Sequence, residues 1–517
     1  MPNRSSDTLF QLVKSLKKSE KRNFKLYVKR NTASDDLKII YLFDALDKMD
    51  VYNELDLLKN NKRLSKQQLS NIKAHLYKQI LASLRLIRGE NDIVIQLHEQ
   101  LDYAEILYNQ GLYLQSLKIL DKIKEYGRDF HQYSYVLETL FFEQKIEALH
   151  ITRSMQDRAG KLAEEMRVVN EKILLSGILS SLSLQLYGWY IQHGVARNEK
   201  DEIAVREFFE SRLPSGMPVV KGFYENLYLY QCYSWFAFIG QDFLSYYRYT
   251  HRWVEIFDKE PAMIHIETAH YIKGMHNLLG AHFDLLNYPK FLETLGRFEK
   301  FFESDEVQEN DNNRIQTFVY LHIAKINKHF INGTFTEGLA LVPFIEDKLK
   351  EYEIYLDRHR ILIFYYKFAS LYFGSGDYEN TIKYLNKIIN WKMDLRTDLQ
   401  CYSRLLHLIA HYELGNDNLL EYLIKSVYRF MAKMENLSKV EEEIFRFLRK
   451  SFKLSAKQLK PEFSSLLERL KTYEKNRFET RAFVYLDIIS WLESKIREVP
   501  VQKIIHEKFL ERNGIQV

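Results

Sequence analysis

Histidines and acidic residues are the side chains of this sequence that could most readily support catalysis or metal binding. The chain has 16 histidines and 69 acids. A zinc site on a helix needs ligands three or four residues apart, so that they share one face. His407 and His411 have this spacing, with Glu413 beyond them, but no third ligand lies nearby. The densest group has steps of five and six residues, which turn the rings in different directions: His265, His270, His276 and His282. We therefore expect histidines that bond between helices, and no metal.

Motifs for nucleotide binding and nucleophilic catalysis are also missing from the sequence. Gly374-Ser375-Gly376 lacks the third glycine of a dinucleotide fingerprint, and neither GxxxxGK[ST] nor GxSxG occurs. The polar, acidic segment 304–313 is predicted to be an exposed loop. A calcium loop is the alternative for this segment, although it lacks the glycine and the terminal glutamate of an EF-hand. The expectation is a protein that is not an enzyme and holds no cofactor.

The charge of the chain is concentrated near its start. Residues 1–90 contain 19 lysines and arginines against 10 acids, a net charge of +9, whereas the whole chain carries +5. The remaining residues therefore sum to −4. One acid, Glu20, lies among eight basic residues that form a possible nucleic-acid patch: Lys14, Lys17, Lys18, Lys21, Arg22, Lys25, Lys29 and Arg30. The alternative for this patch is a solvated basic face on a pair of helices.

Composition indicates long helices with short connections. The 517 residues include 8 prolines and 19 glycines, about half or less of average usage. A chain of this length predicts several domains or a repeat array. The two cysteines, Cys232 and Cys401, lie in helical patterns and are expected to be buried in a reducing compartment. Because no apolar run suits a signal peptide or a membrane span, we expect a cytoplasmic protein.

One phrase recurs along the chain, and its clearest copy is 371–389. An apolar, aromatic helix runs to Gly374, a turn follows at 375–377, and a second helix begins at Tyr378. Gly376 can adopt a positive φ just past the helix end, and Asp377 can cap the next helix. Three further copies turn at Gly111, Gly333 and Gly415, and weaker copies lie around 240 and 287.

These phrases resemble the Gly-Asp-Tyr turn of tetratricopeptide (TPR) repeats. The TPR pattern also wants a small residue five places after the glycine, where this chain has Ser116, Gly338, Thr381 and, as an exception, Leu420. The steps between the turn marks are 39 to 47 residues, longer than the TPR step of about 34. The resemblance therefore implies a TPR-like α-solenoid of long helical hairpins.

A second resemblance covers both ends of the chain. The segments 8–26, 417–430 and 447–450 look like parts of a large, uncharacterised family of bacterial TPR-like proteins. This resemblance implies a shared fold and supplies no function.

The predicted fold is all-α, in three parts. Residues 1–92 form a basic N-terminal helical domain, with Asp7 and Ser19 as possible helix caps. Residues 93–435 form the TPR-like repeats, and residues 436–517 form a C-terminal helical cap.

In TPR folds the first helix of each hairpin lines a concave groove, and the resemblance therefore implies a set of groove positions. With the turn glycine as position fifteen, the twelfth position is aromatic in all four copies, whereas the second and ninth positions hold mixed residues. A carboxylate clamp would place lysine and asparagine in this set, and Asn327 alone fits, so capture of a peptide C-terminus is not expected. With Tyr366 added, the predicted partner-binding residues are Tyr108, Tyr320, Asn327, Phe330, Tyr366, Phe373, Tyr402 and Tyr412. The alternative is that these rings wedge between neighbouring helices.

Two functions follow from these patterns. The first is a protein-binding scaffold or adaptor that uses the concave face of the repeats to bind a protein or peptide partner. The second is a nucleic-acid-associated regulator that joins the basic N-terminal domain to a TPR-like sensor domain.

Overall fold

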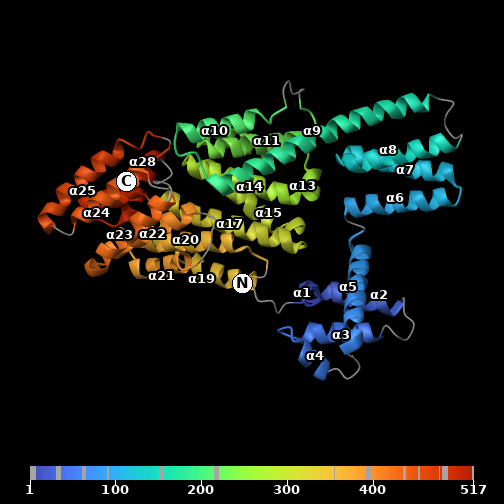
Figure 1. Ribbon diagram of the computed structural model, residues 1–517, viewed down its shortest axis with the longest axis horizontal. Helices are drawn as coiled ribbons and strands as arrows, with labels where there is room; N and C mark the ends of the chain where they lie inside the picture. Colours follow the sequence, from blue (N-terminus) through green and yellow to red (C-terminus); the bar gives the residue numbers. More distant parts are fainter. Residues whose placement is uncertain are drawn as a thin grey trace. The chain divides into compact units, whose positions relative to one another are not determined.

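The computed structural model of the chain is helical wherever it forms regular structure (Figure 1). It describes residues 7–30, 37–60, 66–89, 92–150, 157–214, 220–353, 355–391, 397–434, 438–451, 454–476, 478–479 and 487–514. Within these ranges no strand occurs, which confirms the prediction of an all-α chain for this part. No helix in the same ranges is long and apolar enough to cross a membrane.

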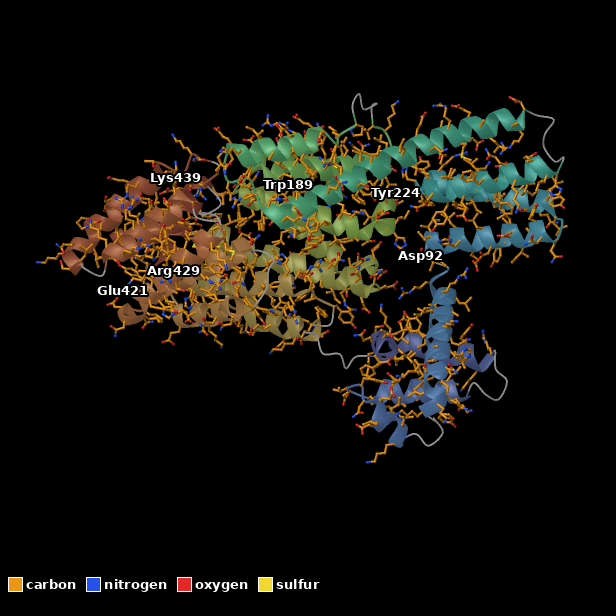
Figure 2. The ribbon with its side chains drawn as sticks, viewed as in Figure 1. Asp92, Trp189, Tyr224, Glu421, Arg429 and Lys439 are labelled. Carbon is orange, nitrogen blue, oxygen red and sulfur yellow. The ribbon has the colours of Figure 1, made fainter. Side chains whose placement is uncertain are left out.

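The chain divides into two compact units, residues 1–169 and 170–517. Helix α9 (Arg158–His193) contributes its first turns to unit 1 and the remainder to unit 2. Side chains fill the space between neighbouring helices within each unit (Figure 2). The predicted boundaries after residues 92 and 435 remain predictions.

Unit 1 begins with five helices around one small core. α5 packs against α1, α2 and α3, and the core includes Val13, Phe24 and Ile80. Asp7 caps α1 as predicted, because its side chain accepts hydrogen bonds from the backbone NH groups of residues 9 and 10. The predicted cap at Ser19 is wrong, since α2 already begins at Lys18. These helices are α1 (Thr8–Ser15), α2 (Lys18–Arg30), α3 (Leu37–Lys48), α4 (Glu54–Asn60) and α5 (Lys66–Arg88).

A buried ion network holds the second half of unit 1, which contains α6 (Ile93–Asn109), α7 (Tyr113–Asp129) and α8 (Tyr133–Leu149). The Nζ of Lys124 on α7 lies 2.5 Å from the Oε2 of Glu143 on α8, and Arg158 on α9 pairs with the other oxygen of Glu143. Both Lys124 and Glu143 are buried. Loss of one partner would leave an uncompensated charge in the interior, so the network fixes how these helices pack.

In unit 2 each helix packs mainly against its neighbours in the chain, around one large hydrophobic core with smaller separate clusters toward the start of the unit. The helices through the middle of the unit are α10 (Glu199–Glu210), α11 (Phe223–Ile239), α12 (Phe243–Lys259), α13 (Ala262–Ile266), α14 (Thr268–Asp284), α15 (Tyr288–Phe302), α16 (Asp305–Gln308), α17 (Asp311–Asn332), α18 (Phe335–Gly338) and α19 (Leu341–Glu351). Those toward its end are α20 (Arg358–Ser375), α21 (Tyr378–Ile389), α22 (Thr397–Glu413), α23 (Asp417–Lys433), α24 (Lys439–Ser451), α25 (Ala456–Lys471), α27 (Ile488–Arg497) and α28 (Val501–Arg512).

Among the described residues, the same turn ends the first helix of six hairpins. A left-handed residue follows the helix, and the next backbone NH donates to a carbonyl five residues earlier, as from Asp377 to Tyr372 at 2.9 Å. This 6→1 bond satisfies a carbonyl that the helix end would leave unpaired. The left-handed residues are Gly111, Gln241, Leu286, Gly333, Gly376 and Gly415. The four glycines match the prediction, and at the two weaker copies the left-handed residue lies one place from the predicted mark.

The small residue after the turn brings the two helices of a hairpin together. Ser116 is fully buried, and its hydroxyl donates to the carbonyl of Ala104 at 2.7 Å. A Cβ built on Gly338 would lie 3.0 Å from the side chain of His329 on the first helix of the same hairpin, and 2.8 Å from that of Leu371 on α20, too close for a carbon contact. Leu420, the predicted exception, is also fully buried.

The acidic segment 304–313 is helical, so the prediction of an exposed loop there is wrong. It contains α16 and the first residues of α17, with Val307 fully buried. The buried side chain of Asn313 donates to the carbonyl of Glu306 at 3.1 Å. The buried Val307 anchors the segment to the core, although the segment is mostly polar and acidic.

The last helix returns to the middle of unit 2. α28 packs against α17 and α20, and the ring nitrogen Nδ1 of His506 lies 2.7 Å from the carbonyl oxygen of Asn332. Phe509 meets Tyr288 edge to face, with ring centroids 4.7 Å apart. A Cβ on Gly333 would lie 2.5 Å from the backbone nitrogen of His506. The docking of α28 thus requires a residue without a side chain at position 333.

Gly333 and Gly376 form a matched pair for testing this docking. Both have positive φ, at 71° and 89°, but no atom lies within 4 Å of a Cβ built on Gly376. Gly376→Ala should therefore lower the free energy of unfolding only by the backbone cost, about 1 kcal/mol. Gly333→Ala should cost at least about 1 kcal/mol more and should also speed amide exchange in α28, because α28 must move away. Urea unfolding with hydrogen exchange measures both, and equal effects would contradict the docking.

Candidate functional site

The predicted groove residues lie largely inside the helix packing. Of these, Tyr320, Asn327, Tyr366, Phe373 and Tyr402 are buried, and Tyr108, Phe330 and Tyr412 are half-buried. Several of the rings contact aromatic neighbours on other helices, such as Tyr412 with Trp491. This placement fits the alternative in which the rings wedge between helices, and binding at these positions remains a prediction.

Three first helices of unit 2 nevertheless bring a group of cations together around two of the predicted residues. α14 supplies a lysine and a histidine, α17 a tyrosine and an asparagine, and α20 an arginine and a lysine. We call this group the cationic cluster: Lys273, His276, Tyr320, Asn327, Arg360 and Lys367. Its charged side chains are half-buried, so they keep some access to solvent.

The ring of Tyr320 is the centre of one half of the cluster. His276 stacks on it, with centroids 4.0 Å apart and planes at 14°. The Nζ of Lys273 lies 5.2 Å from the ring centroid, and the guanidinium carbon of Arg360 lies 5.7 Å from it. Both cations are therefore within the range of a cation–π contact, which holds them near one another despite their like charge.

Lys367 forms the other half of the cluster with Asn327. Its Nζ donates to the Oδ1 of Asn327 at 2.6 Å and lies 5.2 Å from the ring centroid of Phe330. No carboxylate among the described residues lies within 4.0 Å of this ammonium, and Asp284 acts on it only at longer range. Burial lowers the pKa of Lys367 to about 8, with Asp284 opposing the shift.

The pKa of His276 reflects the positive charges of the cations around it. Burial, then the charges of Lys273, Lys367 and Arg360, hold the pKa of His276 well below its ordinary value. The ring is therefore neutral near pH 7. Arg360 has one acid close by, since its Nε lies 3.2 Å from Asp357. The cluster thus presents more positive charge than its neighbours neutralise.

A chain of polar side chains occupies the neighbouring first helices. Ser183 on α9 donates to Gln231 on α11 at 3.2 Å, and the amide of Gln231 lies 3.1 Å from the Nδ1 of His270 on α14. Tyr224, labelled in Figure 2, donates to Glu267 at 2.6 Å. These groups satisfy one another, so they support the positions of α11 and α14 next to the cluster.

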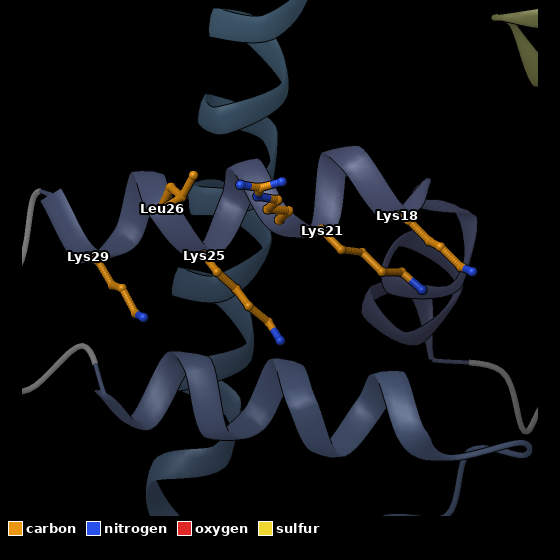
Figure 3. Close-up of a pocket in the computed structure, with 6 residues that line it drawn as sticks. Lys18, Lys21, Lys25, Leu26 and Lys29 are labelled. Atoms are coloured by element: carbon orange, nitrogen blue, oxygen red, sulfur yellow. The ribbon is translucent and has the colours of Figure 1, made fainter.

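In unit 1 the predicted basic patch lies mostly on α2, with Lys14 on α1 and Lys17 just before α2. Lys18, Lys21, Lys25 and Lys29 extend from one side of the helix in Figure 3 and line an open pocket with Arg22 and Leu26. Helix α3 neutralises part of this face, because Lys21 pairs with Asp47 and Lys25 with Asp44, each at 2.6 Å. Lys14 donates to the carbonyl of Asp47 at 2.7 Å, and the backbone NH of Lys17 to Glu20 at 2.8 Å.

Five exposed members of the basic patch have no acidic partner. Within the described part of the chain, no acid pairs with the side chains of Lys14, Lys18, Arg22, Lys29 and Arg30. The positive charge available to a ligand is therefore less than the sequence suggests.

His282, His407 and His411 take part in aromatic packing. His282 contacts the ring of Tyr247, and burial lowers its pKa to about 4. His407 and His411 contact each other edge to face at 4.5 Å, and burial lowers the pKa of His407 to about 4. In the described ranges, no three histidine, cysteine or acidic side chains converge as metal ligands would.

The chain matches no protein-family model, no curated protein and no solved structure.

The sequence prediction reached Tyr320 and Asn327 but missed the cations beside them. Lys367 lies at the sixth repeat position, whereas the predicted groove residues come mainly from the second, ninth and twelfth positions. A signal was present, because Lys367 is the one charged residue between Ile361 and Gly374. A lone lysine in an aromatic, apolar helix is costly to bury and points to a function.

Lys367→Gln tests whether this charge is held at the expense of stability. Glutamine can still donate to Asn327 while removing the ammonium, so the variant should be more stable than the parent at pH 7, by on the order of 1 kcal/mol. Between pH 8 and 10.5 the unfolded state binds more protons than the folded state, so the parent should gain stability as pH rises, and the variant should lack this gain.

The matched control is Lys387→Gln on α21. Lys387 pairs with Glu346 at 3.1 Å and lies over the rings of Tyr365 and Tyr384. Its replacement should lower stability slightly. Urea unfolding at pH 7 and pH 9.5 measures both variants, and a destabilised Lys367→Gln would show that the charge is not under strain.

Proposed function

We propose that the protein is a non-enzymatic, TPR-like scaffold or adaptor of the cytoplasm that binds another protein through the first helices of its hairpins. The cationic cluster is the observation that carries this proposal. It places half-buried, incompletely neutralised positive charge on the first helices α14 and α20, on either side of Tyr320 and Asn327 of α17. Charge held in this way favours a ligand that supplies the missing partner.

The repeated turn supports the solenoid arrangement in this proposal. Six hairpins share the left-handed turn, and the four successive steps from Gln241 to Gly415 are 39 to 47 residues. Regular hairpins that each contact the next are how helical repeats build an extended binding surface. The two cysteines are buried and form no disulfide, which is compatible with a reducing compartment.

Photo-crosslinking from two tyrosine positions tests which surface binds a partner. A benzoylphenylalanine replaces Tyr228, a half-buried residue on the first helix α11, or Tyr422, which is 69% exposed on the second helix α23. The analogue at 228 should capture a discrete protein from native cytosol, whereas the analogue at 422 should not. Identical products from both positions, or products from 422 alone, would count against the proposal.

A second candidate function is nucleic-acid binding by the exposed side of α2. The unneutralised cations Lys18, Arg22, Lys29 and Arg30 favour it, since phosphate contacts come mainly from lysine and arginine. Against it, the paired lysines of the same helix already have acidic partners on α3.

Two double variants of α2 separate these possibilities. If α2 binds phosphates, Lys18→Gln with Lys29→Gln should weaken binding to a short DNA duplex and reduce the salt slope by about 0.9 per lost phosphate contact. Lys21→Gln with Lys25→Gln removes the same charge from residues that α3 already neutralises, and should have the smaller effect. Fluorescence anisotropy across salt concentrations gives both slopes. An affinity of the parent no tighter than about micromolar near 150 mM salt would mean ordinary non-specific binding.

A further inference from the structure

Building on the proposed function, we propose that the cationic cluster binds an extended acidic peptide through two carboxylates three residues apart. The partner is thus a protein segment that carries an acid-x-x-acid sequence. One carboxylate would lie between Lys273 and Arg360 beside Tyr320, and the other would lie at Lys367 and Asn327.

The first argument is charge complementarity. Residues 91–517 sum to −4, yet α14 and α20 bring three cations together, with Asp357 as the one acid in direct contact among the described residues. Lys273 has no ion pair within this part of the chain, and Lys367 has an amide as its sole close polar partner. A bound carboxylate would supply each lysine with the anion that the fold leaves out.

The second argument is the donor chemistry of the cluster. Because the Oδ1 of Asn327 accepts from Lys367, the Nδ2 of the same amide is the group left to donate to a ligand. Ammonium, guanidinium and amide NH groups all donate, and the neutral ring of His276 is occupied by stacking on Tyr320. A site made of donors selects an anionic acceptor, and the fork of Arg360 suits the two oxygens of a carboxylate.

The third argument is the distance between the two halves. Arg360 and Lys367 are seven residues apart on α20, and Tyr320 and Asn327 are seven apart on α17. Seven residues of helix advance about 10 Å. An extended peptide advances about 10 Å over three residues. Two acids at that spacing can therefore reach both halves without bending the peptide.

A polyanion such as RNA fits the same residues less well. It would carry a charge on every nucleotide into a part of the chain whose net charge is negative. Glu267, the N-cap residue of α14, lies six residues before Lys273, and it would repel further phosphates along the same helix. Two cationic positions suit a ligand with two charges.

A random decapeptide library displayed on phage, with the full chain as bait, tests the inference. The selected peptides should be enriched in two acids three residues apart. The enrichment should disappear with the Lys367→Gln bait and persist with Lys425→Gln, which removes an exposed lysine of α23 that pairs with Glu421. Both variants alter one lysine, so loss of folding does not explain a difference if both unfold cooperatively.

Synthetic peptides then identify the carboxylates. In fluorescence anisotropy, replacing either acid of a selected peptide by glutamine should weaken binding about tenfold, as should Lys273→Gln or Lys367→Gln in the protein, each equivalent to about 1.4 kcal/mol. If peptides with an amidated C-terminus bind as tightly as peptides with a free C-terminus, both bound carboxylates belong to side chains. If binding requires the free C-terminus, one of the two is the C-terminal carboxylate.

Three results would overturn the inference. The first is a selection in which the acidic pair is not enriched. The second is selected peptides that bind the Lys367→Gln variant as tightly as the parent. The third is an RNA oligonucleotide that binds the parent more tightly than every peptide does and no longer binds the Lys367→Gln variant. Crosslinking at position 228 distinguishes this failure from failure of the proposed function. If that crosslink forms and no acidic pair is selected, protein binding stands and the acidic peptide is excluded.

Discussion

The backbone NH of Asp377 donates to the carbonyl of Tyr372 across the left-handed Gly376. Hairpins in both units depend on a 6→1 bond of this type at their turns. It ends one helix and starts the next in the opposite direction within a few residues. Where the helix then packs follows from the small residue after the turn, such as Ser116 or Gly338. The positions of the first helices, and of the charged side chains on them, are consequences of this local geometry.

Gln241 shows why one of these turns uses a residue other than glycine. A positive φ of 57° costs energy for a residue with a side chain. The side-chain Nε2 of Gln241 donates to the carbonyl of Ala196 at 2.8 Å, and the NH of Ala196 donates to the carbonyl of Ile239. The side chain therefore anchors the connection between α9 and α10 to this hairpin, which glycine could not do.

The sequence allowed the helices and most turns to be predicted, because these depend on neighbours in the chain. The turn at Gly376 and the caps at Asp7 and Asp377 use residues within a few positions of one another. The cationic cluster was not predictable in this way, because Lys273, Asn327 and Lys367 come from three helices and meet only when hairpins pack. Lys367 is conspicuous in its own helix as a lone charge, but the site that it belongs to depends on Asn327, a partner 40 residues away.

The contact of α28 with Gly333 changes how unit 2 can fold. In a simple repeat array each hairpin gains stability from its neighbours alone, and folding can follow synthesis from the first repeat onward. Here the last turn of α17 bonds to His506 across 174 residues. At 5–20 residues per second, roughly 10–35 s separate the synthesis of these two contacts. During that interval Tyr288 and the end of α17 lack their final cover, so the unit becomes cooperative only when α28 has left the ribosome.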